Sequence, residues 1–117
     1  MARILVVDDE SFNIDAAKII LEYSIKLCGC NEIIDSALDG QYALDKVKRN
    51  VQENDNLRCS YDLIMMDCNM PFMDGYESTK RIRQYLFSQK IDQPIILAVT
   101  GHLEPDYVDR AIDSGMN

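Results

Sequence analysis

Short apolar runs alternate along the chain with longer segments in which apolar residues recur every three or four positions. The apolar runs predict buried strands at residues 3–7, 33–38, 63–66 and 95–99. Each run is followed by a segment with helical periodicity. A strict alternation of strands and helices favours parallel strands joined by right-handed crossovers. It therefore predicts an α/β fold with helices on both faces of one sheet.

Four helices are predicted from the spacing of the apolar residues. The first begins at Phe12 and ends near Gly29, with a stripe formed by Phe12, Ala16, Ile19, Ile20, Tyr23 and Leu27. The second follows Asp39-Gly40 and carries Ala43, Leu44, Val47 and Val51, before a polar surface loop at residues 50–60. The third is marked by Tyr76, Thr79, Ile82, Arg83 and Leu86. The fourth begins at Glu104-Pro105, with Val108, Ala111 and Ile112 facing inward and Gly115 as its C-terminal cap.

Composition and charge narrow the possible functions. With 117 residues, 47% of them apolar and 27% charged, the chain is predicted to form one globular domain. Its formal net charge of −8 disfavours binding to nucleic acid or to an anionic membrane surface. The longest apolar run is far too short to span a bilayer, and Met1 leads directly into a strand instead of a signal peptide. These features favour a cytoplasmic protein.

The four cysteines are Cys28, Cys30, Cys59 and Cys68, and they show neither CxxC spacing nor a neighbouring cluster of histidines. A zinc site is therefore not expected. Free cysteines that serve as small buried apolar residues are favoured over a disulfide framework. Cys68 is adjacent to Asp67, so a reactive thiol is an alternative to a packing role there.

Polar residues follow three of the predicted strands at the point where each strand ends. Asp8 and Asp9 follow the first strand, Asp67 ends the third, and Thr100 follows the fourth. Because parallel strands gather their carboxyl ends at one edge of the sheet, where α/β proteins hold their ligands, these side chains are expected to meet. A single such aspartate could merely cap a turn, but the repetition on three strands favours a functional site.

Three crowded carboxylates repel one another by about 4 kcal/mol per close pair at an effective dielectric constant near 20. A cation relieves this repulsion, and an all-oxygen set of ligands favours Mg²⁺. A carboxylate is already ionised at neutral pH and can act as a nucleophile toward phosphorus without a base. The Thr100 hydroxyl could then donate a hydrogen bond to a transferred phosphoryl group.

The chain resembles a response-regulator receiver domain, the phosphoacceptor part of two-component signalling. The matching segments are residues 4–10, 39–44, 61–75, 94–101 and 111–116. The signature Asp-x-Asn-Met-Pro-x-Met-Asp-Gly at residues 67–75 is specific, and the resemblance covers essentially the whole chain. It is closest in style to receivers attached to hybrid sensor histidine kinases.

The resemblance implies a three-layer, flavodoxin-like parallel sheet with strand order 2-1-3-4-5. It assigns phosphorylation to Asp67 and Mg²⁺ binding to Asp9, Asp67 and the backbone carbonyl of Asn69, with Asp8 acting through water. It makes Thr100 the switch hydroxyl, and it gives Gly101 a role in donor access and His102 one in hydrolysis. The implied partner is a histidine kinase or a histidine phosphotransfer protein. The implied role is that of a phosphoacceptor that catalyses only its own phosphorylation.

The sequence departs from the family pattern at its end. Receivers continue with a fifth strand, which carries a Lys that pairs with the phosphoryl group, and a fifth helix, whereas this sequence ends at Asn117. The expected sheet is therefore 2-1-3-4, and self-association through the exposed edge is a further expectation. A non-phosphorylated interaction module is the alternative function. A phosphohydrolase with an aspartate nucleophile is a weaker alternative, because Asn69 stands where such enzymes place an acid–base Asp.

Overall fold

The computed structural model describes residues 2–28, 32–99 and 105–117. The elements are β1 (Ala2–Val7), α1 (Ser11–Cys28), β2 (Glu32–Ala37), α2 (Gly40–Glu53), β3 (Tyr61–Asp67), α3 (Gly75–Ser88), β4 (Ile95–Val99) and α4 (Pro105–Ser114). The strands of this sheet are parallel and lie in the order β2-β1-β3-β4. The predicted α/β class and strand order are both confirmed.

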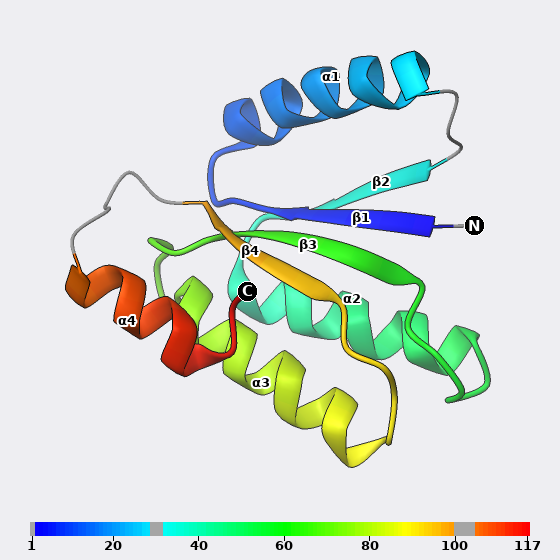
Figure 1. Cartoon of the computed structure of the whole chain (residues 1–117), viewed down its shortest axis with the longest axis vertical. Coiled ribbons are helices and arrows are strands. Elements are labelled where there is room, and N and C mark those ends of the chain that lie inside the picture. Colours follow the sequence, from blue (N-terminus) through cyan, green and yellow to red (C-terminus); the bar gives the residue numbers. More distant parts are fainter. Residues whose placement is uncertain (1, 29–31, 100–104) are drawn as a thin grey trace.

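Helices cover both faces of the sheet, so the fold has three layers. α1 lies on one face, and α2, α3 and α4 lie on the other (Figure 1). The larger apolar core, on the side of α2 and α3, includes the fully buried Leu5 and Ile64. The smaller core, under α1, is formed by Ile4, Val6 and Ile14. Alternate residues of β1 therefore enter opposite cores, as expected for a strand that is buried on both faces.

Two aspartates fix the beginnings of α2 and α3. The Asp39 carboxylate accepts a hydrogen bond from the Tyr42 amide at 2.6 Å, and the Asp74 carboxylate accepts one from the Glu77 amide at 2.9 Å. Each satisfies a backbone donor that the first turn of a helix leaves unpaired. The cap at Asp74 ends the loop that begins at Asp67, so it also sets the length of the loop at the edge of the sheet.

The apolar stripe that predicts α1 is not the face of α1 that packs on the sheet. Ile14 is buried, and Ala17, Leu21 and Ile25 pack beside it against β1 and β2. The predicted stripe faces solvent, with exposed fractions of 66–77% for its large residues Phe12, Ile19, Ile20, Tyr23 and Leu27. α1 is thus apolar on two faces.

The boundary predicted between α2 and the following loop is wrong by four residues. α2 continues to Glu53, and Asn50, predicted to begin a surface loop, is buried. The Asn50 side-chain oxygen accepts hydrogen bonds from the Ser60 amide at 2.6 Å and the Asn54 side chain at 3.2 Å. These hydrogen bonds satisfy the buried Asn50 side chain, so this polar residue does not end the helix.

The inward orientation predicted for α4 is also wrong. Val108 is 44% exposed and Ile112 is 62% exposed, while Ala111 is only partly buried against the larger core. The predicted C-terminal cap is confirmed, since Gly115 has φ +105° and its amide donates to the Ile112 carbonyl at 3.0 Å. α4 is therefore well capped at its C-terminus, but it buries few of its side chains against the rest of the domain.

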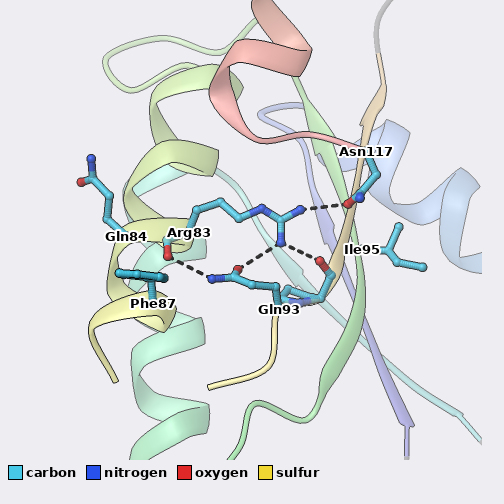
Figure 2. Close-up of a pocket in the computed structure, with 7 residues that line it drawn as sticks. Arg83, Gln84, Phe87, Gln93, Ile95 and Asn117 are labelled. Atoms are coloured by element: carbon cyan, nitrogen blue, oxygen red, sulfur yellow. Dashed lines mark hydrogen bonds between the residues drawn. The ribbon is translucent and has the colours of Figure 1, made fainter. Parts of the chain in front are cut away.

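Arg83 of α3 donates hydrogen bonds to the residues just before β4 and to the residues just after α4. Its Nη1 donates to the Pro94 carbonyl at 2.7 Å and to the Gln93 side chain at 3.0 Å, and its Nη2 donates to the Asn117 side chain at 2.8 Å (Figure 2). Its Nε donates to the Gly115 carbonyl at 2.9 Å. Burial lowers the pKa of the guanidinium. The network forms one wall of a cavity of about 570 Å³.

Asn117 is hydrogen-bonded to the outer edge of β4. The Asn117 amide donates to the Ile96 carbonyl at 2.8 Å, and the Ile96 amide donates to the Asn117 side chain at 2.8 Å. On the α1 side of the sheet β4 is uncovered (Figure 1), and Ile95, Leu97 and Val99 are 42–52% exposed. The predicted self-association through this edge stays a prediction.

Candidate functional site

Three carboxylates from two adjacent strands converge at the carboxyl edge of the sheet. Asp8 and Asp9 follow β1, Asp67 is the last residue of β3, and β1 and β3 are hydrogen-bonded neighbours. One carboxylate oxygen of each lies within 4.8 Å of those of the other two. The sequence prediction that these aspartates meet is therefore confirmed.

The three aspartates differ in how firmly they are held. Asp8 is only 9% exposed, and its Oδ1 accepts hydrogen bonds from the Glu10 amide at 2.9 Å and the Asn13 side chain at 3.5 Å. Asp9 is exposed, and Asp67 is half-buried. The cluster therefore combines a buried, oriented Asp8 with two more accessible carboxylates.

The loop after Asp67 is held close to the strand end. The Asn69 amide donates to Asp67 Oδ1 at 3.1 Å, and the Gly75 amide donates to the Cys68 carbonyl at 3.3 Å. A Cβ atom on Gly75 would lie 2.2 Å from the Asp67 carbonyl oxygen and 2.9 Å from the Cys68 Cα. Only glycine allows α3 to begin this close to the strand, because both opposing atoms belong to the backbone.

The pKa of the Asp67 carboxyl is raised from its ordinary 3.8 to about 6. Burial is the largest cause, and the negative charges of Asp8 and Asp9 raise the pKa further. The hydrogen bond from the Asn69 amide acts in the opposite direction because it stabilises the carboxylate. Ionisation of Asp67 is therefore costly in the absence of a cation, and a bound cation would stabilise its carboxylate.

This raised pKa predicts how stability depends on pH. Between pH 3.8 and about 6 the folded protein retains a proton on Asp67 that the unfolded chain has lost. Stability therefore decreases as the pH rises through this window, by roughly 1–2 kcal/mol in the metal-free protein because partial exposure screens the charges. Asp67→Asn should remove the effect and be the more stable protein at pH 7. Urea unfolding with a chelator at several pH values measures this, and a wild-type-to-variant difference that is constant with pH would contradict it.

The donor set fits a hard divalent cation. All three groups offer carboxylate oxygens, and their separation allows one ion to contact a single oxygen of each. The described residues place no cysteine or histidine in the cluster, so the ligands favour Mg²⁺ over softer metals. The position of the Asn69 backbone carbonyl as a further ligand stays a prediction.

Three of the predicted site residues lie outside the described part of the chain. They are Thr100, Gly101 and His102, for which the roles of switch hydroxyl, donor access and hydrolysis tuning remain predictions. Cys68, predicted to have a packing role, is 4% exposed and belongs to the larger core. Burial raises the pKa of its thiol, so the geometry favours packing over reactivity.

One group beside the site was not predicted from the sequence. Arg110 of α4 lies 4.2 Å above the ring of Tyr76 and 3.6 Å from the carboxylate of Asp74, the cap of α3. A cavity of about 310 Å³ between α4 and the loop after Asp67 is lined by Arg110, Tyr76, Cys68 and Asn69, among others. The sequence offers one signal of this contact, which is that Arg110 is the only basic residue in α4. It holds α4 against the first turn of α3, next to the acidic cluster.

The family model for the response regulator receiver domain matches residues 4–117. The chain belongs to this family. The resemblance inferred from the motifs is thereby confirmed, and with it the two-component class of signalling protein.

Similar proteins include a two-component response regulator and a histidine kinase. Two-component response regulator ORR41 of Oryza sativa subsp. japonica is 32% identical over 115 residues, covering 98% of this chain and 78% of that protein. Probable histidine kinase 2 of Oryza sativa subsp. indica is 42% identical over 90 residues, covering 73% of this chain. The matched residues span only 8% of that kinase.

A solved structure agrees closely in fold. It is the receiver domain of the histidine kinase CKI1 from Arabidopsis thaliana, complexed with Mg²⁺ and BeF3⁻. The TM-score is 0.83 with 32% sequence identity, over 98% of this chain and 76% of that one. Within the described residues, no helix of this receiver domain is long and apolar enough to cross a membrane.

Proposed function

We propose that the receiver domain accepts a phosphoryl group on Asp67 from a phosphohistidine, in a two-component phosphorelay. The convergence of Asp8, Asp9 and Asp67 within 4.8 Å is the observation that carries the proposal. It supports a site built to hold a divalent cation against the one carboxylate that ends the central strand β3. Family membership and the Mg²⁺-bound receiver of CKI1 support the same assignment.

In the proposed step an Asp67 carboxylate oxygen attacks the phosphorus atom of the donor. A P–O bond forms, the N–P bond to the donor histidine breaks, and the imidazole nitrogen takes up a proton as it leaves. The Asn69 amide, which donates to Asp67 Oδ1 at 3.1 Å, orients the carboxylate so that its other oxygen is available. Because Asp9 is exposed and Asp67 is partly exposed, a bulky protein donor can approach from solvent.

Mg²⁺ would be held by Asp8, Asp9, Asp67 and the Asn69 carbonyl, and it would offset the charge that accumulates among carboxylates and phosphoryl oxygens. Asp8, the most buried, would act through a water molecule and hold its orientation through Glu10 and Asn13. Asp9, exposed and opposite Asp67, would contribute a direct oxygen ligand.

The donor is proposed to be a histidine kinase or a histidine phosphotransfer protein. A phosphohydrolase function is less well supported, because Asn69 is an amide and its backbone hydrogen bond already fixes its place beside Asp67. An amide cannot exchange a proton as an acid–base catalyst would.

Labelling with radioactive acetyl phosphate and Mg²⁺ tests the proposal. The chain is expected to take up one label that is stable in acid and lost in base, as an acyl phosphate is. Asp67→Asn should lose the label entirely, because an amide is a poor nucleophile. Removing divalent cations with EDTA should reduce labelling of the wild type to background.

Asp106→Asn is the matched control. Asp106 is an exposed acidic residue in the first turn of α4, so its replacement changes the net charge by the same amount. It should label as the wild type does. Label that persists in Asp67→Asn, or that resists base, would sink the assignment to Asp67. A wild type that takes up no label would favour the non-phosphorylated interaction module.

A further inference from the structure

The outward face of α1 is an apolar stripe with an ordered pattern of charges beside it. The stripe consists of Phe12, Ile19, Ile20, Tyr23 and Leu27, with the smaller Ala16 between the first two. At about 3.6 residues per turn it lies opposite the face that packs on β1 and β2. Both faces of α1 are apolar, but packing on the sheet buries only the inner face (Figure 1). The outward face remains exposed to solvent.

All four charged residues of α1 lie along one flank of this stripe. They are Asp15, Lys18, Glu22 and Lys26, which alternate in sign along the helix. In the described part of the chain none of the four is in an ion pair with another residue. The opposite flank is neutral, with Asn13 and Ser24. The charges of α1 sum to zero, so α1 contributes nothing to the net charge of −8. Two copies that meet through α1 therefore bring no excess of negative charge from this helix into the contact.

This pattern is complementary to itself when it is reversed. If two α1 helices stack antiparallel with their centres at Ile20, Asp15 of each copy faces Lys26 of the other, and Lys18 faces Glu22. The two-fold axis places both charged flanks on the same side of the helix pair, so opposite charges meet. In a parallel arrangement the two-fold axis runs along the helices and places the charged flanks on opposite sides of the pair, so these pairs of opposite charge do not form.

The apolar residues fit the same arrangement. Ile20 meets Ile20 at the axis, the large Tyr23 lies opposite the small Ala16, and Phe12 lies opposite Leu27 at each end. Each of the five large exposed side chains offers on the order of 100 Å² of apolar surface. The contact therefore buries on the order of 1,000 Å² over both copies, the size of a weak and reversible interface.

We propose that the outward face of α1 is the contact of a homodimer in which two α1 helices pack antiparallel about Ile20. The stripe and its charge order select a second copy of this chain, because the complementarity is to α1 itself. The dimer does not depend on phosphorylation of Asp67.

Sedimentation velocity of the full chain, over concentrations from below to well above micromolar, tests the dimer. The wild type is expected to pass from monomer to dimer with a dissociation constant on the order of 10 μM. Ile20→Asp places two carboxylates against each other at the axis and should give a monomer at every concentration. Leu57→Asp is the matched control, because Leu57 is 78% exposed in the loop after α2 and lies outside the contact.

Charge reversal tests the antiparallel register. Asp15→Lys and Lys26→Glu alone should each weaken the dimer by about tenfold, since each makes two like-charge contacts. The double variant should restore wild-type affinity, which a merely sticky surface would not do. Circular dichroism and thermal unfolding of each variant establish that it is folded.

Three results would overturn the proposal. The first is a wild type that stays monomeric at all concentrations. The second is a dimer that is lost in Leu97→Asp and kept in Ile20→Asp, which would place the contact on the uncovered face of β4. The third is a double charge reversal that is no tighter than the single variants.

Discussion

Gly75→Ala is expected to destabilise the domain by about 4 kcal/mol or more and to displace the Asp67 carboxylate. An alanine Cβ would lie 2.2 Å from the Asp67 carbonyl oxygen and 2.9 Å from the Asp67 carbonyl carbon, and neither atom can rotate away. The first turn of α3 must therefore separate from the end of β3. At an ordinary helix position a Gly-to-Ala substitution stabilises the protein by about 0.5–1 kcal/mol. A loss of stability in Gly75→Ala is therefore attributable to the close approach of α3 to the end of β3.

Gly40→Ala provides the comparison. A Cβ on Gly40 would lie 2.6 Å from the Met73 carbonyl oxygen and 3.0 Å from the Ser78 Cβ, where the start of α2 meets the start of α3. It should also destabilise the domain, but its contacts do not involve the Asp67 backbone. Urea unfolding gives both stabilities, and acetyl phosphate labelling at low temperature reports on Asp67. Equal labelling of the two variants would contradict a positioning role for the approach of Gly75.

The strands could be predicted because their sequence pattern and their environment correspond directly. β1 and β3 lie in the middle of the sheet, are buried on both faces, and are therefore written as unbroken apolar runs. The acidic cluster followed from the same property, since parallel strands must bring Asp8, Asp9 and Asp67 to one edge. For these features the local pattern implies the tertiary arrangement.

The helices on the surface could be predicted as helices but not as packed elements. α1 is apolar on two faces, so periodicity identified the stripe of Ile19 and Tyr23 and could not reveal that the opposite face meets the sheet. In α4 the apolar Val108 and Ile112 indicated an inward face, yet they remain exposed because α4 rests mainly on α3. Amphipathicity gives a direction only when a single face is apolar.

The finer features of the site depend on distances that no sequence pattern encodes. The raised pKa of Asp67 results from burial and from the proximity of Asp8 and Asp9. The cation–π contact of Arg110 with Tyr76 joins α4 to the first turn of α3, with β4 between the two helices in the sequence. Both arise from tertiary packing, which a local sequence pattern does not describe.

Arg83→Met is expected to cost about 3 kcal/mol of stability, nearly all of it through lost hydrogen bonds. The guanidinium donates to the carbonyls of Gly115 and Pro94 and to the side chains of Gln93 and Asn117, all within 3.0 Å. Methionine keeps the apolar length of the side chain and leaves partly buried carbonyl groups without this donor. Urea unfolding at pH 7 measures the loss, and hydrogen exchange of α4 should accelerate with it.

Two variants show whether geometry or charge carries this effect. Arg83→Lys keeps the positive charge, but one ammonium group cannot reach four acceptors that a planar guanidinium spans, so it should lose about 2 kcal/mol. Arg81→Met, on the exposed side of α3, removes only a surface ion pair with Glu77 at 3.0 Å and should lose less than about 0.5 kcal/mol. A lysine variant as stable as the wild type would show that charge alone suffices. The guanidinium network would then not be what holds the end of the chain against β4.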